Sequence, residues 1–419
     1  MNHDVLDARE TRDPEQRERE LMAALPGHIA RAKQAPGFAA ILEGVEPGDI
    51  RSRAALAQLP VTRKSDLREA QRRAPPLAGL NATPVGGLAR LFMSPGPIFD
   101  PQGRGEDWWR FARPLYAGGV RAGGLIHNCF SYHFTPAAFM VEGGAARIGC
   151  TVIPAGIGQT EMQVEAIAHL RPDTYVGTPS FLRIIIEKAR ELGADVSSLR
   201  RAVMGGEALP ESLRQWLEAN GVPQVLQTYA TADLGSVAYE TAGGGVRQPG
   251  MVLDEDVIVE IVRPGTGTPL PPGEVGEVVV TLLNEDYPLV RFATGDLSAL
   301  LTDAPPSPCG RTNARIRGWM GRADQTTKVR AMFVHPAQID NIVRRHPPVH
   351  KARLVVSGQM AQDVMTLHCE VDDPQATGLA DALVETIRDV TKLRGEVRLA
   401  PRGSLPNDGK VIEDARDYR

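Results

Sequence analysis

The chain has 419 residues, of which 42% are hydrophobic and 23% are charged, and this length and composition predict more than one domain with an ample core. The formal net charge of -4 excludes a strongly basic surface for nucleic acids or anionic membranes, and no apolar run reaches the ~20 residues of a membrane span. Four scattered cysteines and a densely charged N-terminus predict a cytoplasmic protein with no signal peptide and no cysteine-rich zinc site.

The first part of the chain reads as helical and then changes to alternating strands and helices. Residues 1–80 contain short amphipathic segments at 21–33 and 38–42, and Ser65 is expected to cap the start of a helix. Between residues 90 and 240, strand-like runs alternate with segments of helical periodicity, which is typical of a parallel sheet covered by helices. The expected strands are 125–130, 151–154, 174–176, 201–204 and 225–228, and the expected helices are 162–170, 181–192 and 211–220.

Two further regions complete the predicted fold. Residues 246–301 are rich in β-formers, with strands at 257–262 and 277–283 joined through Pro/Gly turns, and they predict an antiparallel subdomain. A smaller α+β unit begins near residue 323. Its expected strands are 352–356, 364–371 and 396–399, and its expected helix is 379–391.

The predicted fold class is therefore α/β. A large N-terminal domain of helix-flanked sheets with a β-rich subdomain is expected at 1–322, and a small, mobile α+β C-terminal domain is expected at 323–419. The expected parts of the large domain are a helical region at 1–80, an α/β part at 81–245 and the β-rich subdomain at 246–322.

The stretch from residue 287 to residue 328 places two functional side chains on tight turns. An apolar run ends in Thr294-Gly295-Asp296, so a carboxylate lies at a strand end beside a glycine that permits a sharp turn. A carboxylate there can accept hydrogen bonds from two vicinal hydroxyl groups, as on a ribose. Further on, Gly321-Arg322 offers a guanidinium on a second turn. Taken singly, each fragment also fits an ordinary hairpin end.

In this order, the two fragments resemble the adenylate-forming superfamily, specifically its phenylacetate–CoA ligase-like branch. Residues 59–67 are similar to that family's "LP-x-T-x-K-x-DL" segment, and the resemblance covers nearly the whole chain. It implies that Asp296, Arg317 and Arg322 bind the nucleotide. It also implies that Asp324 is the hinge between a large ATP- and acid-binding domain and a small lid domain.

Lys410 lies on a glycine turn near the end of the chain, where the family has its own glycine–lysine pair. In the family this lysine reaches the active site and bridges the carboxylate and the α-phosphate, so the resemblance implies a catalytic role for Lys410. Asp414 and Arg416 also match the family's tail. A solvated surface lysine is the ordinary alternative.

The run 227–233 combines an aromatic and an acidic residue, where the family has "YG-x-TE". Tyr229 offers a face for adenine stacking, and Asp233 is expected to bind Mg²⁺, through water because Asp is one methylene shorter than Glu. A buried tyrosine and a helix-capping aspartate are the alternative. The resemblance assigns the nucleotide to Ser94, Gly96, Gly205, Gly206, Glu207, Thr228, Tyr229, Ala230, Thr231, Asp233, Asp296, Arg317 and Arg322.

Residues 94–101 resemble the family least, although they match its phosphate loop, "S-S/T-G-T-T-G-K-P". Ser94 and Gly96 remain, but two prolines inside the loop lack the N–H groups that bind phosphate. Asp100 places a negative charge where the family has lysine. The sequence therefore predicts a weaker grip on pyrophosphate from this loop.

The acyl and CoA sides are assigned by resemblance as well. Residues 149–163 are similar to the family's "GA-x-VIP-x-G-G-x-TE-x-Q", and residues 175–180 are similar to its "TPSY" turn. The family has glycine where this chain has Ala331, and that glycine lets the pantetheine arm pass close to the backbone. The expected acyl-pocket residues are Tyr132, Phe134, Gly177, Thr178 and Pro179, and the expected CoA-side residues are Lys328, Arg330 and Ala331.

The resemblance implies ATP-dependent activation of a carboxylic acid, an aromatic one in the family, followed by transfer of the acyl group to the CoA thiol. ATP, Mg²⁺ and CoA are the expected cofactors, a small carboxylic acid is the expected partner, and a homodimer stays open. Two alternatives remain. Ala331 suits an enzyme that loads a carrier protein or an amine, and the loop at 94–101 suits a degenerate, non-catalytic homologue that binds a nucleotide or an acyl-adenylate.

Overall fold

The computed structural model describes most of the chain, and two of the expected functional segments lie outside it. The described residues are 4–94, 96–302, 307–323, 327–329, 332–334, 336–358, 363–406 and 410–416, with the backbone alone for Lys328, Phe333, Pro336, Ala337 and Asp340. The expected hinge Asp324 and the CoA-side residues Arg330 and Ala331 are outside these residues, as is the side chain of Lys328.

The chain divides into two compact units. The large unit comprises Met1–Leu209 and Leu213–Met320, and the C-terminal unit comprises Gly321–Arg419 and Pro210–Ser212. In the part of the chain that the structure describes, no helix combines the length and the apolar composition needed to cross a bilayer.

An eight-stranded sheet forms the centre of the large unit, in the order β16-β12-β9-β8-β7-β6-β4-β5. Strands β4 to β8 pair in parallel, as predicted, whereas β9, β12 and β16 continue the sheet antiparallel. β8 is therefore shared by a parallel and an antiparallel half. The bounds are β4 Leu125–Asn128, β5 Thr151–Ile153, β6 Thr174–Gly177, β7 Arg201–Met204, β8 Gln224–Thr231, β9 Gly235–Tyr239, β12 Met251–Leu253 and β16 Arg315–Ile316.

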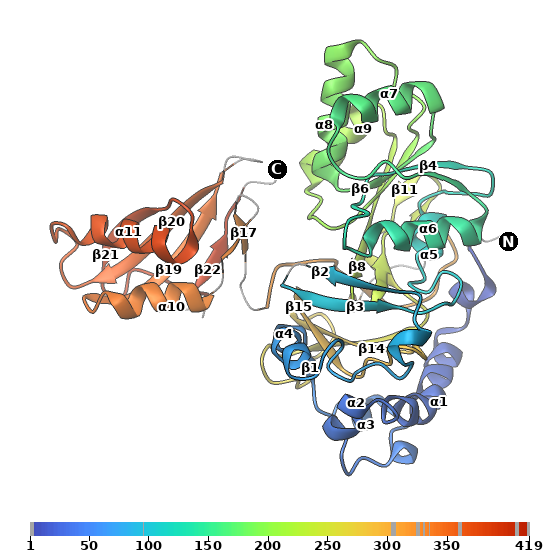
Figure 1. Ribbon diagram of the computed structural model, residues 1–419, viewed down its shortest axis with the longest axis horizontal. Coiled ribbons are helices and arrows are strands. Elements are labelled where there is room, and N and C mark those ends of the chain that lie inside the picture. Colours follow the sequence, from blue (N-terminus) through green and yellow to red (C-terminus); the bar gives the residue numbers. More distant parts are fainter. Residues whose placement is uncertain are drawn as a thin grey trace. The chain divides into compact units, whose positions relative to one another are not determined.

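Helices lie beside this sheet (Figure 1), and apolar side chains join them to it. One cluster joins α7, α8 and α9 to strand residues such as Tyr175 and Ala202, and another joins α5 and α6 to Ile126 and Val203. The expected helices are confirmed, although α7 and α8 each begin two residues earlier than predicted. The bounds are α5 Ala112–Ala117, α6 Ala137–Ile148, α7 Thr160–Leu170, α8 Pro179–Leu192 and α9 Glu211–Ala219.

A second, four-stranded sheet has the order β1-β15-β14-β13. β13 (Val257–Val262), β14 (Gly276–Leu282) and β15 (Phe292–Ser298) are antiparallel, as expected, and the short β1 (Thr62–Arg63) joins β15 in parallel. The prediction that Ser65 caps a helix is wrong. Pairing with β15 keeps the backbone extended as far as Arg63, so α4 begins at once at Lys64 with no side-chain cap.

Arg291 fastens the segment before β1 to this sheet. Its buried guanidinium donates hydrogen bonds to both carboxylate oxygens of Glu260 (3.0 Å each) and to the carbonyl oxygens of Ala57 (2.8 Å) and Leu59 (2.6 Å). One buried cation thus joins β13, β15 and the chain that leads into β1. The position of Lys64, directly after β1, follows from this arrangement.

The remaining elements of the large unit lie around the two sheets. Apolar residues of α1 and α2, among them Leu25 and Phe38, share one core with Ile258 and Val280 of the second sheet. The bounds are α1 Pro14–Ala32, α2 Pro36–Ile41, α3 Arg53–Leu56 and α4 Lys64–Arg73, with 3₁₀ turns at Ala8–Thr11, Pro47–Asp49 and Val85–Gly87. Two hairpins pair β2 Arg90–Ser94 with β3 Ile98–Gln102, and β10 Ala242–Gly243 with β11 Val246–Arg247.

The C-terminal unit has its own core beneath a four-stranded sheet in the order β21-β20-β19-β22. Its mixture of helices and strands agrees with the α+β prediction, and β20 and α11 have the expected bounds, whereas α10, β17, β18 and β22 were not predicted. The bounds are β17 Thr327–Val329, β18 Met332–Val334, α10 Pro336–Arg345, β19 Val349–Ser357, β20 Val364–Val371, α11 Leu379–Thr391, β21 Glu396–Pro401 and β22 Ile412–Asp414.

Candidate active site

The carboxyl ends of the parallel strands bring the predicted site segments of the large unit to one edge of the sheet. Residues 129–134 follow β4, residues 178–179 follow β6, and residues 205–207 follow β7. Because parallel strands end at the same edge, segments that are far apart in the sequence meet there. This is the edge at which ligands bind in sheets of this kind.

Asp296 lies at the centre of a hydrogen-bonded group formed by three segments. The Tyr229 hydroxyl donates to Asp296 Oδ2 (2.9 Å), and the Trp319 indole N–H donates to Asp296 Oδ1 (3.1 Å). The Tyr229 oxygen also lies 3.2 Å from Thr294 Oγ1. Gly295 adopts a positive φ of 77°. The prediction that Asp296 lies at a strand end is wrong, because β15 continues to Ser298 past an irregularity in its pairing with β14. The carboxylate is 8% exposed, so it is held in one orientation at the site's edge.

The turn after β7 approaches β8 and the segment after β4 closely. The backbone N–H of Gly205 donates to the carbonyl oxygen of Gly177 (3.1 Å). A Cβ atom on Gly205 would lie 3.3 Å from Thr228 Cγ2 and 3.4 Å from the Phe130 ring, so a larger residue would crowd both. The exposed Glu207 carboxylate accepts a hydrogen bond from the Ser180 hydroxyl (2.6 Å). The glycine pair therefore allows the backbone to reach the shared edge, as expected.

The two predicted aromatic residues of the acyl pocket have different surroundings. The Tyr132 hydroxyl donates to Glu142 (2.6 Å) and accepts from Asn128 (2.9 Å), and its ring packs edge-on against Phe139. Burial and then Glu142 raise the pKa of Tyr132, so the hydroxyl stays protonated. Phe134 is 58% exposed at a positive φ of 62°. In the large unit, Tyr132 is thus held by hydrogen bonds and ring packing, whereas Phe134 is exposed.

A lysine and two aspartates form a buried cluster beside this site, and we call Lys64, Asp100 and Asp233 the acidic cluster. The Lys64 ammonium is paired with Asp233 Oδ2, and the Asp233 side chain is fully buried. Asp100 is also fully buried, and among the described residues neither of its carboxylate oxygens has a hydrogen-bond partner. Tyr287, whose buried hydroxyl likewise lacks a described partner, lies close to both aspartates.

The charges of the acidic cluster act on one another. Burial, and then the neighbouring Asp233 carboxylate, hold the pKa of Asp100 well above its usual range. Burial lowers the pKa of Lys64, but the carboxylates of Asp233, Asp100 and Asp296 outweigh this effect and raise it. Lys64 is therefore a charged ammonium that lies within reach of Asp296 as well.

The β2–β3 hairpin contains the expected phosphate loop. Ser94 pairs with Ile98 across the hairpin, and its buried hydroxyl donates to the Ile98 carbonyl oxygen (3.3 Å). Gly96 lies in the turn, while Pro95 is outside the described residues. Gln71 of α4 exchanges two hydrogen bonds with the Phe99 backbone (2.7 and 2.9 Å), so the hairpin is fastened next to Lys64.

The other predicted nucleotide residues are placed less centrally. Thr228 is buried and bonds to the Ala238 carbonyl oxygen (3.4 Å), and Thr231 Oγ1 accepts a hydrogen bond from the Leu234 backbone (3.2 Å) in the turn that contains Asp233. Asp233 is thus a turn residue and not a helix cap. Arg317 is exposed after β16, and Arg322 belongs to the C-terminal unit.

Lys410 is exposed in the C-terminal unit, directly before β22. Its carbonyl oxygen accepts a hydrogen bond from the Arg353 guanidinium (3.2 Å), and Arg353 also pairs with Glu413 (3.1 Å). The tail residues that match the family are joined to the same unit: Thr327 donates to Asp414 (3.0 Å), and Asp414 pairs with Arg416. The backbone at Lys410 is therefore anchored to the sheet through β19 and β22.

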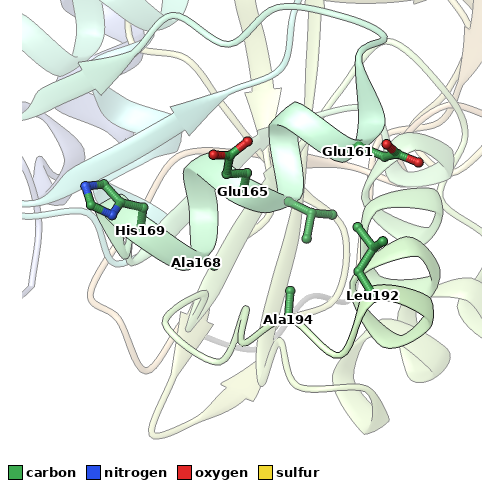
Figure 2. Close-up of a pocket in the computed structure, with 7 residues that line it drawn as sticks. Glu161, Glu165, Ala168, His169, Leu192 and Ala194 are labelled. Atoms are coloured by element: carbon green, nitrogen blue, oxygen red, sulfur yellow. The ribbon is translucent and has the colours of Figure 1, made fainter.

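A groove of about 590 Å³ between α7 and α8 contains none of the predicted site residues (Figure 2). Glu161, Glu165 and His169 line it along one helix, and Leu192 and Ala194 lie opposite.

Among the described residues, no group of three or more His, Cys, Asp or Glu side chains could hold a metal ion. The enclosed, lysine-paired Asp233 carboxylate does not fit the metal ligand that was expected there.

Sequence reasoning gave no role to Trp319 or Lys64, although both lie at the site. Trp319 stands in the same 287–328 stretch as Asp296, and an indole N–H next to a turn is a signal that could have been used. Lys64 matches the lysine of the family's "LP-x-T-x-K-x-DL" segment, but its partner, Asp233, is 169 residues away in the sequence and was not predicted. Only the pairing of β1 with β15 brings it to the site.

Comparison with known proteins gives concordant matches. The profile of the family "AMP-binding enzyme" matches residues 118–282. Phenylacetate–coenzyme A ligase of Thermus thermophilus is 30% identical over 90% of this chain and 90% of its own length. The enzyme of the same name from Escherichia coli is 30% identical over 88% of this chain and 86% of its own length.

The solved structures agree on the fold. The crystal structure of 2-hydroxyisobutyryl-CoA ligase in complex with 2-HIB-AMP and CoA superposes with a TM-score of 0.75. It covers 98% of this chain and 92% of that chain at 23% sequence identity. The predicted α/β fold class is thereby confirmed.

Proposed function

This chain belongs to the phenylacetate–CoA ligase branch of the adenylate-forming superfamily, and on that premise we propose that it is an AMP-forming acid–thiol ligase. It activates a carboxylic acid with ATP and passes the acyl group to the thiol of CoA. The observation that carries this proposal is the similarity to a phenylacetate–coenzyme A ligase, which covers 90% of this chain and 90% of the length of that enzyme.

The reaction has two balanced steps. An oxygen of the acid's carboxylate attacks the α-phosphorus of ATP, the bond to the β-phosphate oxygen breaks, and pyrophosphate leaves. The CoA thiol, as it loses its proton, then attacks the acyl carbon of the acyl-adenylate, and AMP leaves as the thioester forms. Mg²⁺ enters as part of the MgATP substrate.

In the large unit, Asp296 is the proposed anchor for the ribose hydroxyl groups. Its two oxygens accept hydrogen bonds from Tyr229 and Trp319, and a carboxylate oxygen can accept more than one hydrogen bond, which suits a ribose hydroxyl. Charge-assisted hydrogen bonds of this kind are stronger than neutral ones. Tyr229 contributes by fixing the carboxylate, in addition to the aromatic face that the sequence assigned to adenine.

The glycine turn at 205–207 and the residues around Tyr132 are proposed to hold the adenine and the acyl group respectively. The close approach of Gly205 to Thr228 and Phe130 leaves a flat backbone surface, which suits a planar base. Tyr132 and Phe139 give the acyl side an aromatic wall, and this supports an aromatic acid as the substrate.

The C-terminal unit is proposed to act as a lid that serves both half-reactions. Lys410 would stabilise the charge that builds on phosphorus during adenylation. The segment containing Lys328, Arg330 and Ala331 would serve the CoA step, with the change of pose at Asp324. A homodimer and a cytoplasmic location stay predictions from the sequence.

ATP–pyrophosphate exchange across a panel of aryl and alkyl carboxylates tests this function. We expect exchange that depends on the acid and needs no CoA, followed by thioester formation once CoA is added. Exchange without any CoA thioester would favour a carrier protein or an amine as the acceptor. Absence of exchange with every acid, in a protein that still binds ATP, would contradict the ligase function.

A further inference from the structure

The acidic cluster occupies the place where the resemblance expected a metal ligand. Asp233 carries the carboxylate in question, and one of its oxygens is taken by the Lys64 ammonium. The Asp233 side chain has no exposed surface, whereas that of Lys64 is 23% exposed. The cation that pairs with this buried carboxylate is therefore the lysine of the same chain.

The framework around Lys64 keeps it in this position. Its backbone follows β1, which pairs with β15, and Arg291 anchors the preceding segment. On the other side, Gln71 joins α4 to β3, the strand that carries Asp100. A lysine fixed from two sides is a built part of the site and not a mobile surface charge.

Asp100 also stabilises the Lys64 ammonium at this position. This aspartate is buried beside Asp233, and none of the described residues donates a hydrogen bond to it. If the ammonium left, the buried Asp233 carboxylate would lose its ion-pair partner while Asp100 lies beside it, which is costly in a low-dielectric interior. The cluster therefore needs one positive charge at this point, and Lys64 supplies it.

A magnesium ion has different requirements. It keeps near-ideal octahedral geometry with oxygen ligands at about 2.0–2.1 Å and retains several of its waters. One oxygen of the enclosed Asp233 carboxylate is already paired with Lys64, and an ammonium in contact with this carboxylate would repel the ion.

We propose that the Lys64 ammonium is a fixed cation at Asp233, and that Asp233 does not bind the divalent ion of MgATP in this enzyme. The metal is then held by the phosphates and water, while the protein supplies its own positive charge. This inference rests on the proposed function only for the nucleotide complex, because the pairing of Lys64 with Asp233 exists without any nucleotide.

Binding of Mn²⁺, followed by electron paramagnetic resonance, tests the proposal with and without α,β-methylene-ATP. The variants are Asp233→Asn, Lys64→Met and the double variant, and Asp66→Asn, an exposed aspartate on the same helix, is the control. Circular dichroism checks the fold, and calorimetry checks nucleotide binding separately, so a failure of the proposed function is seen as loss of nucleotide binding in the wild type.

We expect Asp233→Asn to change the Mn²⁺ affinity of the nucleotide complex by less than about twofold, like the control. Lys64→Met should gain at least about tenfold in Mn²⁺ affinity even without nucleotide, and the double variant should lose that gain. A loss of about tenfold or more in Asp233→Asn, the least expected for a true ligand, would overturn the proposal. A Lys64→Met variant whose Mn²⁺ affinity does not rise would overturn the proposal as well. The comparison of Lys64→Met with the double variant applies even where Asp233→Asn alone does not fold.

Discussion

The proposed chemistry gives its main roles to Asp296 in the large unit and to Lys410 in the C-terminal unit. The surroundings of the two side chains differ. Asp296 is 8% exposed, and both of its oxygens accept hydrogen bonds from rings on other segments. Lys410 has an exposed side chain, and its backbone carbonyl oxygen accepts a hydrogen bond from Arg353.

The difference matches the two tasks. A ribose anchor works best when it is oriented before the ligand arrives, because no ordering cost is then paid on binding. A lysine that serves one of two half-reactions must reach the reacting atoms and leave again, which suits an exposed side chain on a fixed backbone. Each prediction below tests one side of this contrast.

Lys410→Ala should have the largest effect. We expect acyl-adenylate formation to fall on the order of 10²–10³-fold, as when one preorganised charge-stabilising group is removed, while ATP binding stays unchanged. ATP–pyrophosphate exchange measures the first quantity and calorimetry the second. Lys392→Ala, an exposed lysine of the same unit, is the control. Exchange within a few-fold of the wild type would remove Lys410 from catalysis.

Asp324→Pro should separate the two half-reactions. Proline fixes φ near -65° and restricts the preceding residue, so a hinge there would be trapped in one pose. One half-reaction should slow by orders of magnitude while the other stays within about tenfold of the wild type. Single-turnover measurements of acyl-AMP formation and of thiolysis would show this, with Asp324→Ala as the flexible control. Equal losses in a folded protein would argue against domain rotation.

Asp296→Ala should weaken ATP binding on the order of 10²-fold or more. It removes two charge-assisted hydrogen bonds to the ribose, at about 1.5–3 kcal/mol each before the remaining groups are resolvated. Isothermal titration with ATP measures the loss, and Glu274→Ala, an exposed acid in the same sheet region, is the control. A change in acid preference with unchanged ATP affinity would instead place Asp296 in the acyl pocket.

The parts of the site that could be predicted from the sequence are those with local signals. Asp296 stands beside a glycine at the end of an apolar run, and the turn at 205–207 follows an apolar strand, so each carries its own pattern. Most helices and strands were predictable for the same reason. The partners of Trp319 and Lys64 were not predicted, because only the fold brings them to Asp296 and Asp233. The misplaced helix cap at Ser65 has that cause too, since β1 exists only beside β15.

Trp319→Phe should have the smallest effect and is the sharpest test of how Asp296 is held. Phenylalanine keeps an aromatic ring but removes the indole N–H that donates to Asp296 Oδ1. Trp319 is 43% exposed, so water can replace much of this hydrogen bond. We therefore expect ATP affinity to fall by about 0.5–1.5 kcal/mol, or roughly two- to tenfold.

Measuring the effect of Trp319→Phe on ATP affinity in the wild type and in the Asp296→Ala variant shows how Trp319 acts. If it acts by orienting the carboxylate, Trp319→Phe should have no effect on ATP affinity once Asp296 is alanine. Met320→Leu, at the neighbouring exposed position, controls for general changes at this turn. An effect of the same size in both backgrounds would mean that Trp319 contacts the nucleotide by itself. The hydrogen bond from Trp319 would then not orient Asp296, and the contrast with Lys410 would rest more heavily on the buried Tyr229 hydroxyl.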